Sequence, residues 1–153
     1  MTYEETLHYL YTSIPVFQHS GASAYKPGLG TSIALDDYLG NPHKAYKTIH
    51  VAGTNGKGSV SHLLAAILRQ SGFKVGLYTS PHLVDFRERI RVNGKKISQD
   101  YVVDFVERHR SFFEPLHPSF FELTSSMAFE YFRDQQVDYA VIEVGLGGRL
   151  DST

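Results

Sequence analysis

The sequence has no cysteine, no excess of basic residues and no long hydrophobic run, and each absence excludes a class of protein. Without cysteine there are no disulfides and no thiolate metal sites, which fits a reducing compartment. The formal net charge is -1 and the pI about 6.7, so we expect no nucleic-acid partner. No apolar stretch approaches the roughly 20 residues of a membrane helix, and the N-terminus, MTYEETLHYL, lacks the features of a signal peptide. We therefore expect a soluble, cytoplasmic protein with no membrane partner.

The sequence does contain enough apolar residues for one domain with a core, because 42% of its 153 residues are hydrophobic. Predicted strands alternate with predicted helices, which is typical of an α/β fold with a mostly parallel, doubly wound sheet. Strands are predicted at 47–52, 75–79 and 137–144, and a hairpin at 89–97 that turns at Asn93-Gly94. Helices are predicted at 2–17 (with Thr2 and Glu5 as a capping box), 34–39, 59–71, 100–113 and 121–135, and a loop and a turn at 18–32 and 53–58.

A glycine-rich segment between the first predicted strand and its helix is the sharpest feature of the sequence. Residues 50–60 read HVAGTNGKGSV. Small residues allow backbone N–H groups to surround phosphate oxygens, the helix N-terminus adds partial positive charge, and Lys57 can reach the β- and γ-phosphates of a nucleotide. The segment departs from the standard phosphate loop, because Val51 replaces the first glycine and Gly58 separates the lysine from Ser59.

A turn that only joins a strand to a helix is the alternative interpretation of this segment, but the lysine at the helix entrance favours phosphate binding. Ser59 either binds a phosphate or only occupies the start of the helix. The predicted ATP-binding residues are Gly53, Thr54, Asn55, Gly56, Lys57, Gly58 and Ser59.

Two further motifs follow the phosphate segment: YTSPHL at 78–83 and IEVGLGGRLD at 142–151. In this order, the three motifs resemble those of the folylpolyglutamate synthase/dihydrofolate synthase family of the Mur-ligase superfamily. KPGL at 26–29 and LGNP at 39–42 extend the likeness toward the N-terminus. The resemblance implies a P-loop-containing, Mur-ligase-like central domain. Because the chain ends just after a glycine-rich turn, we expect a truncated form of it, without the rest of this domain and without the C-terminal glutamate-ligase domain.

Glu143 interrupts an apolar strand near its C-terminal end, where ligands bind in open α/β sheets. A buried carboxylate there is costly unless it is paired or bound to a cation, so we predict a magnesium ligand. The alternative is that Glu143 caps a loop or pairs with Arg149. Ser80 follows another strand at the same predicted edge, and Mg²⁺ prefers oxygen ligands. The resemblance implies metal-binding roles for both Ser80 and Glu143, and a histidine ligand beyond Thr153. We do not expect His62 or His82 to bind the metal.

The resemblance also implies a site for the pterin or folate. Phe86 lies in a charged segment that is either a solvated hairpin or a loop that contacts the pterin, and the residues that open the helix near 121 would border the same site. Phe120 and Phe121 are alternatively core residues, whereas the Glu122 carboxylate can accept hydrogen bonds from ring N–H groups. The predicted substrate residues are Phe86, Ser119, Phe120, Phe121, Glu122, Leu150, Asp151 and Ser152.

The implied activity is ATP-dependent addition of L-glutamate to dihydropteroate or a folate through an acyl phosphate, with Mg²⁺ as cofactor and with Lys57 and Glu143 as catalytic residues. We expect a monomer that does not turn over by itself. Two alternatives stay open: a nucleotide-binding regulatory module without ligase activity, and another Mur-type amino-acid ligase. Gly58 and the GLGGRLD turn argue against the second.

Overall fold

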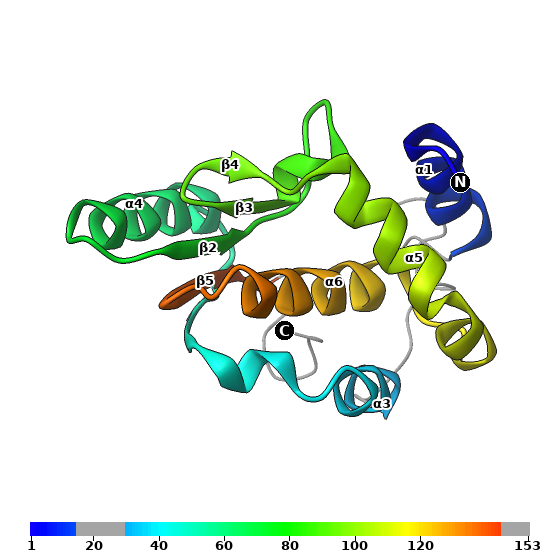
Figure 1. The fold of residues 1–153 in the computed structure, drawn as a ribbon. Coiled ribbons are helices and arrows are strands. Elements are labelled where there is room, and N and C mark those ends of the chain that lie inside the picture. Colours follow the sequence, from blue (N-terminus) through cyan, green and yellow to red (C-terminus); the bar gives the residue numbers. More distant parts are fainter. Residues whose placement is uncertain (15–29, 145–153) are drawn as a thin grey trace.

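The computed structural model describes residues 1–14 and 30–144, and at its centre lies one mixed sheet (Figure 1). Its strands are β1 (Lys47–Val51), β2 (Val75–Tyr78), β3 (Ile90–Val92), β4 (Lys95–Lys96) and β5 (Tyr139–Glu143), in the spatial order β1-β5-β2-β3-β4. Strand β5 pairs in parallel with both β1 and β2, whereas β3 and β4 continue the sheet as an antiparallel hairpin. The chain therefore returns from the end of the sequence to place β5 between the two earlier parallel strands.

Helices cover both faces of this sheet, as the doubly wound prediction requires. On one face, α4 (Lys57–Gln70) packs Leu64 and Leu68 against a small cluster from β1, β2 and β5. On the other face, α6 (Phe120–Asp134) contributes to the main core (Figure 1). The approach of α6 is close: a Cβ atom on Gly76 would lie 2.6 Å from the Phe132 ring. The predicted α/β architecture is confirmed.

Further helices complete the main core around α6. They are α1 (Tyr3–Ser13), α3 (Gly30–Tyr38) and α5 (Gln99–Phe113), with the 3₁₀ turns η2 (Pro42–Ala45), η3 (Phe86–Arg89) and η4 (Glu114–Leu116). The capping box of Thr2 and Glu5 is present at α1, and Ser119 and Glu122 form a second one at α6. Within the described parts of the chain, no helix combines the length and the apolar character needed to cross a membrane.

Several predicted boundaries differ from the structure, among them those of three helices. Helix α1 ends at Ser13 because Ile14 is extended, and the last residues of its predicted range lie outside the described part. Helix α3 begins at Gly30, inside the predicted loop. Helix α4 begins at Lys57 rather than Ser59, because Gly56 takes a left-handed φ of 72° as its N-cap and Gly58 is already helical. The hairpin turn is as predicted, with φ values of 48° at Asn93 and 81° at Gly94.

Candidate functional site

The predicted ATP-binding and metal-binding residues lie at the carboxyl ends of the three parallel strands. Val51 at the end of β1 pairs with Glu143 at the end of β5, and Tyr78 at the end of β2 pairs with Ile142. Since parallel strands point the same way, the segments that follow them emerge at one edge of the sheet. The glycine-rich loop, Glu143 and Ser80 are brought together in this way.

The glycine-rich loop is an exposed turn that leads into a helix N-terminus. Residues 52–56 are all exposed. Gly53 has a φ of 153° and Gly56 a φ of 72°, conformations that L-residues with side chains rarely adopt. No side chain caps α4 at Gly56, so the N–H groups of its first turn remain available to a ligand. Such a helix start attracts anions because its free N–H groups carry partial positive charge.

Lys57 extends from the first turn of α4 toward the end of β5. Its Nζ donates a hydrogen bond of 2.8 Å to the carbonyl oxygen of Val144. Burial raises the pKa of Glu143, and the positive charge of Lys57 opposes part of that rise. Lys57 therefore lies close to Glu143, where β5 ends beside the glycine-rich loop.

Glu143 is only 5% exposed and lies against the phosphate loop. A Cβ atom on Gly58 would lie 3.6 Å from Glu143 Oε2. Burial raises the pKa of Glu143, and the Lys57 charge, a hydrogen bond from the Ser80 backbone N–H and the His62 charge oppose that rise. The carboxylate thus faces the loop and adjoins Ser80, while the alternative partner, Arg149, lies outside the described residues.

Glu143 and Ser80 fit a hard divalent cation rather than a transition metal. Both offer oxygen, which Mg²⁺ prefers, and a buried carboxylate gains most from a cation. Among residues 1–14 and 30–144, no group of three or more histidine, cysteine, aspartate or glutamate side chains is placed to enclose a metal. A Mg²⁺ site does not need three protein ligands, because the ion usually keeps several waters and binds phosphate oxygens in addition to one or two carboxylates.

His82, two residues after Ser80, has both ring nitrogens engaged by other side chains. Arg89 Nε donates to His82 Nδ1 at 2.7 Å, and Tyr11 Oη lies 3.0 Å from Nε2. Because Nδ1 accepts, Nε2 carries the proton of the neutral ring and donates to the tyrosine. Burial lowers the pKa of His82, and the Arg89 charge lowers it further. These contacts give His82 a structural role.

The aromatic residues predicted to contact a pterin lie within or beside the core. Phe86 is 1% exposed, and its ring centroid is 5.8 Å from that of Phe120. Phe120 in turn stacks on Tyr11 at 5.3 Å, and the Phe121 ring lies 5.9 Å from that of Tyr78. Packing accounts for these residues, so their assignment to a substrate site stays a prediction.

Ser119 and Glu122 have a local role at the start of α6. Glu122 Oε1 accepts the Ser119 N–H at 2.9 Å, and the Ser119 hydroxyl accepts the Glu122 N–H at 3.1 Å. Ser32 of α3 adds a bond of 3.4 Å to Glu122 Oε2. The other predicted substrate residues, Leu150, Asp151 and Ser152, lie outside the described residues.

Arg89 was not predicted from the sequence, although it is only 4% exposed. Its guanidinium lies 5.1 Å above the Phe120 ring in addition to its bond with His82. The capping role of Glu88 was also not predicted from the sequence. Asp85 and Glu88 have the spacing of a capping box, which can be recognised in a sequence.

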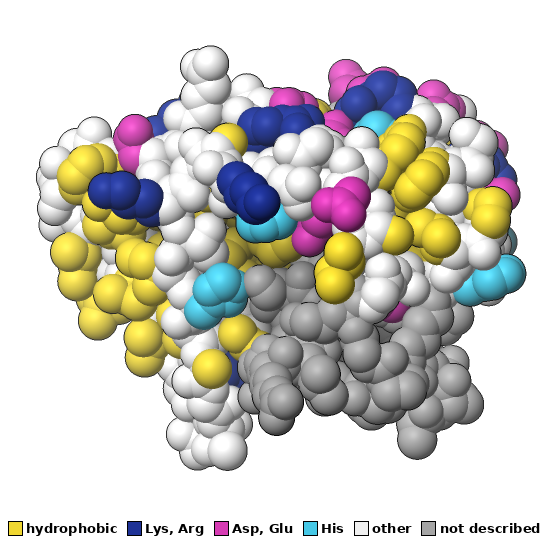
Figure 2. Space-filling model, turned by 90° about the horizontal axis from the view of Figure 1, so that it is seen from below, with side chains coloured by type: hydrophobic (Ala, Val, Ile, Leu, Met, Phe, Trp, Pro, Cys, Tyr) yellow, Lys and Arg dark blue, Asp and Glu magenta, His cyan; other side chains and the backbone are white. Residues whose placement is uncertain are grey.

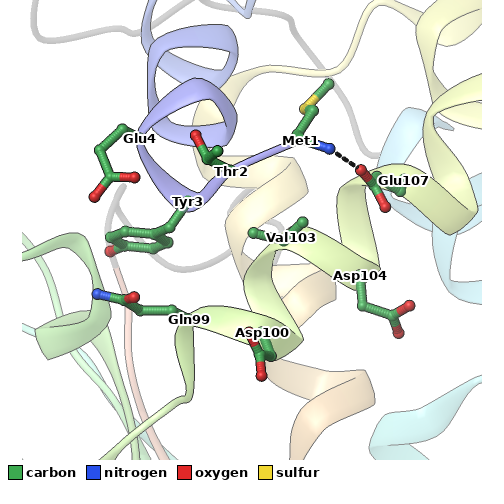
Figure 3. A pocket seen from close by; sticks show the side chains of 9 residues that line it. All are labelled: Met1, Thr2, Tyr3, Glu4, Gln99, Asp100, Val103, Asp104 and Glu107. Atoms are coloured by element: carbon green, nitrogen blue, oxygen red, sulfur yellow. Dashed lines mark hydrogen bonds and ion pairs between the residues drawn. The ribbon is translucent and has the colours of Figure 1, made fainter.

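A pocket of about 260 Å³ opens between the starts of α1 and α5 (Figure 3). Its lining includes four acidic side chains, Glu4, Asp100, Asp104 and Glu107, of which the last pairs with the N-terminal amine. None of the predicted ATP-binding or metal-binding residues lines it, and its carboxylates would repel phosphate. It is therefore not part of the candidate site.

No protein-family model matches the chain, but individual proteins do. Dihydrofolate synthase/folylpolyglutamate synthase of Bacillus subtilis is 42% identical over 135 residues, which are 84% of this chain and 31% of the relative. The crystal structure of folylpolyglutamate synthase from Thermotoga maritima superposes with a TM-score of 0.87 at 48% identity, covering 98% of this chain and 34% of that one. A solved FPGS–AMPPCP–folate complex superposes with a TM-score of 0.85 at 38% identity, covering 100% of this chain and 37% of the other.

The chain thus spans about a third of the length of these relatives. The structural likeness covers 98% and 100% of this chain. The chain belongs to the folylpolyglutamate synthase/dihydrofolate synthase family.

Proposed function

We propose that this chain binds ATP and Mg²⁺ at the carboxyl edge of its sheet, as the nucleotide-binding part of an ATP-dependent ligase. The ligase adds L-glutamate to dihydropteroate, to folates or to both, in the cytoplasm and as a monomer. The observation that carries the proposal is the position of Glu143, a buried carboxylate that faces the phosphate loop and adjoins Lys57 and Ser80. A similar protein solved as an AMPPCP–folate complex supports the choice of ligands.

The loop and Lys57 are the groups that bind and orient the nucleotide. The free N–H groups at the start of α4 receive phosphate oxygens, and Thr54, Asn55 and Ser59 border the same space. Lys57 Nζ leaves the Val144 carbonyl and moves to the phosphates, where its charge stabilises the transferring phosphoryl group.

Glu143 and Ser80 would hold Mg²⁺ beside the phosphates. The cation, when bound, supplies additional positive charge for the phosphates and offsets the cost of keeping Glu143 ionised in a buried position. The Ser80 N–H holds the carboxylate in place through its hydrogen bond.

The proposed chemistry has two displacement steps. A carboxylate oxygen of the pteroate or folate attacks the γ-phosphorus of ATP, and ADP leaves, which gives an acyl phosphate. The amine nitrogen of glutamate then attacks the acyl carbon, inorganic phosphate leaves, and the amine loses a proton as the amide forms. The chain contributes positioning and charge neutralisation to the first step.

The organic substrate would lie against the segment of Phe86 and the start of α6, and Leu150, Asp151 and Ser152 would belong to the same site. The groups that bind glutamate, and a second domain, would come from parts of a longer protein. In this proposal the 153 residues bind Mg–ATP but do not complete the reaction.

Calorimetric titration of the chain with ATP, with and without Mg²⁺, tests the site. We expect Lys57→Ala to weaken ATP binding by about 10-fold to 100-fold, since a hydrogen bond to a charged group contributes about 1.5–3 kcal/mol. Glu143→Ala should remove the dependence on Mg²⁺. Lys74→Ala is the matched control, because Lys74 precedes β2 at the opposite edge of the sheet. Unchanged affinities in the first two variants would refute the assignment.

The ligase activity is tested in the longer protein, where folate-dependent release of phosphate should require glutamate. Magnesium-dependent ATP binding without any such release would instead support a regulatory nucleotide-binding module.

A further inference from the structure

The segment that joins β2 to η3, residues 79–85, carries Ser80 and is bonded at its first residue. The Thr79 N–H donates to the carbonyl oxygen of Arg89 at 3.0 Å. The Ser80 N–H lies close enough to the Glu143 carboxylate to lower its pKa. The position of Ser80 relative to the acid therefore depends on how the remainder of this segment is held.

Glu88 holds the other end of the segment through three consecutive backbone amides. Its Oε1 accepts the Leu83 N–H at 2.9 Å, and its Oε2 accepts those of Val84 at 3.2 Å and Asp85 at 2.9 Å. Successive N–H groups that converge on one anion form a nest, a stable local arrangement. The amides of Asp85 and Leu83 lower the pKa of Glu88, so the carboxylate is ionised at neutral pH.

Burial does not order this end of the segment. Leu83 is 91% exposed and Val84 is 90% exposed. Aliphatic side chains in water gain no hydrophobic stabilisation from a fixed position, while fixing their backbone costs conformational entropy. At Leu83 and Val84 the bonds to Glu88 are therefore what fixes the backbone, whereas Asp85 is also held through its side chain by Tyr3 and Arg87.

Between the two ends, His82 is bonded by Tyr11 and Arg89. The stretch from Ser80 to His82 is thus short and is fixed on both sides. Because only Pro81 separates Ser80 from His82, a displacement at residues 83–85 that breaks the His82 bonds also moves Ser80.

We propose that Glu88 is a positioning residue: by binding the amides of residues 83–85, it fixes the segment that presents Ser80 to Glu143 and so sets the geometry of the metal–nucleotide site. Glu88 touches neither nucleotide nor substrate in this role. The ligand part of the inference rests on the proposed function, whereas the effect on Ser80 is independent of it.

Amide NMR of the chain tests the positional effect directly. In Glu88→Ala we expect hydrogen-exchange protection at residues 83–85 to be lost and the Ser80 amide resonance to shift, with a melting temperature close to that of the wild type, because Glu88 is on the surface. Glu88→Gln should be intermediate, since an amide oxygen still accepts a hydrogen bond without the charge. The control is Glu5→Ala, because Glu5 completes an equivalent capping box at α1 and should leave Ser80 unchanged.

The second measurement is the affinity for ATP with and without Mg²⁺. We expect Glu88→Ala to weaken Mg–ATP binding about tenfold and to leave metal-free ATP binding unchanged, because the phosphate loop is not altered. A Ser80 amide unaffected by Glu88→Ala overturns the inference, and so does a shifted Ser80 amide with unchanged Mg–ATP affinity. If the wild-type chain does not bind Mg–ATP, the proposed function fails, and the NMR result alone decides whether Glu88 positions Ser80.

Discussion

At the scale of single residues, Glu143 is a carboxylate with little access to water. Its strand is otherwise apolar, and this contrast in the sequence was sufficient to select it as a site residue. Its orientation toward the loop was not readable there, because a strand residue can face either side of a sheet. In the structure Glu143 lies near Gly58, on the same face as Val141, which packs against α4.

Glu143→Gln should stabilise the metal-free protein at neutral pH. Burial raises the pKa of Glu143, so the folded state binds its proton more tightly than the unfolded state. The stability that this group contributes is present below pH 4.5, the pKa of the group in the unfolded state. It is lost as the pH rises through the pKa of the folded state. We expect melting at pH 7.5 to rise by roughly 2–4 °C in the variant, the effect of about 1 kcal/mol in a domain of this size.

Below pH 4 the melting temperatures of Glu143→Gln and wild type should converge, since the wild-type carboxyl is then neutral in both states. Glu4→Gln, which changes an exposed glutamate, serves as the control. A variant less stable than the wild type at pH 7.5 without Mg²⁺ would contradict the electrostatic argument.

Residue types were more informative for Lys57 and Glu143 than for the aromatic residues. A lysine after glycines at a helix start has few structural explanations. Phe86 and Phe120, by contrast, have side chains that suit a core and a ligand pocket equally well, and only the tertiary structure shows their packing. The role of Glu122 as a cap was visible in its spacing from Ser119 but was not weighed against substrate binding.

At the scale of elements, periodicity and turn residues predicted the strands and the long helices. These elements depend mainly on interactions between residues that are close together in the sequence. The Asn93-Gly94 hairpin is the clearest example. The start of α4 was placed two residues late because glycine normally weakens a helix, whereas Gly58 lies in the first turn of α4, beside Glu143. The order of strands depends on contacts distant in sequence, which no local pattern contains.

A buried ionic network joins α5 to α6. Glu130 of α6 is 1% exposed and accepts bonds from Arg108 at 2.9 Å and from Tyr101 at 3.3 Å, with His109 Nε2 at 3.0 Å. Burial raises the pKa of Glu130, but the bonds from His109 and Arg108 outweigh that effect and the net shift is downward. The ionised carboxylate is thus a fixed contact between the two helices.

Glu130→Gln should destabilise the fold by about 2–3 kcal/mol at pH 7, the contribution expected of charged hydrogen bonds that are lost from a buried position. Because folding lowers the pKa of Glu130, this stability is present above pH 4.5, the pKa of the group in the unfolded state. It is lost as the pH falls through the pKa of the folded state. Denaturant titrations at pH 7 and pH 3 should therefore show a large difference from the wild type only at pH 7.

Asp104→Asn is the matched control for Glu130, because Asp104 bonds to the same arginine at 2.6 Å but has a side chain that is 58% exposed. Exposed pairs contribute about 0–1 kcal/mol. Equal losses in the two variants would show that burial does not set the strength of this network.

At the scale of the whole molecule, the surface is uneven in its polarity. Along α4, Val60, Leu63 and Ile67 are 47%, 62% and 52% exposed, although the other side of the helix packs on the sheet. Figure 2 shows hydrophobic side chains gathered at the end of the molecule where α4 lies. The periodicity of the sequence predicts this helix and its apolar face, but it does not show which apolar side chains are covered.

The last prediction concerns what these 153 residues do as a unit. If the phosphate loop, Lys57 and Glu143 are sufficient for binding, Mg–ATP should stabilise the chain by mass action. At a concentration about 100 times the dissociation constant, the gain is about 2.7 kcal/mol, or roughly 5–10 °C in melting temperature for a domain of this size. Metal-free ATP should give a smaller shift, and AMP, which lacks the β- and γ-phosphates, should give almost none.

The same sample should release no ADP when dihydropteroate, folate and glutamate are added, because binding free energy accelerates a reaction only when the reacting groups are also held in place. Differential scanning fluorimetry and a coupled ADP assay on one preparation separate the two properties. Substrate-dependent ADP release would show that the chain already contains a complete catalytic site, and an unshifted melting temperature would show that the loop alone does not form a nucleotide site.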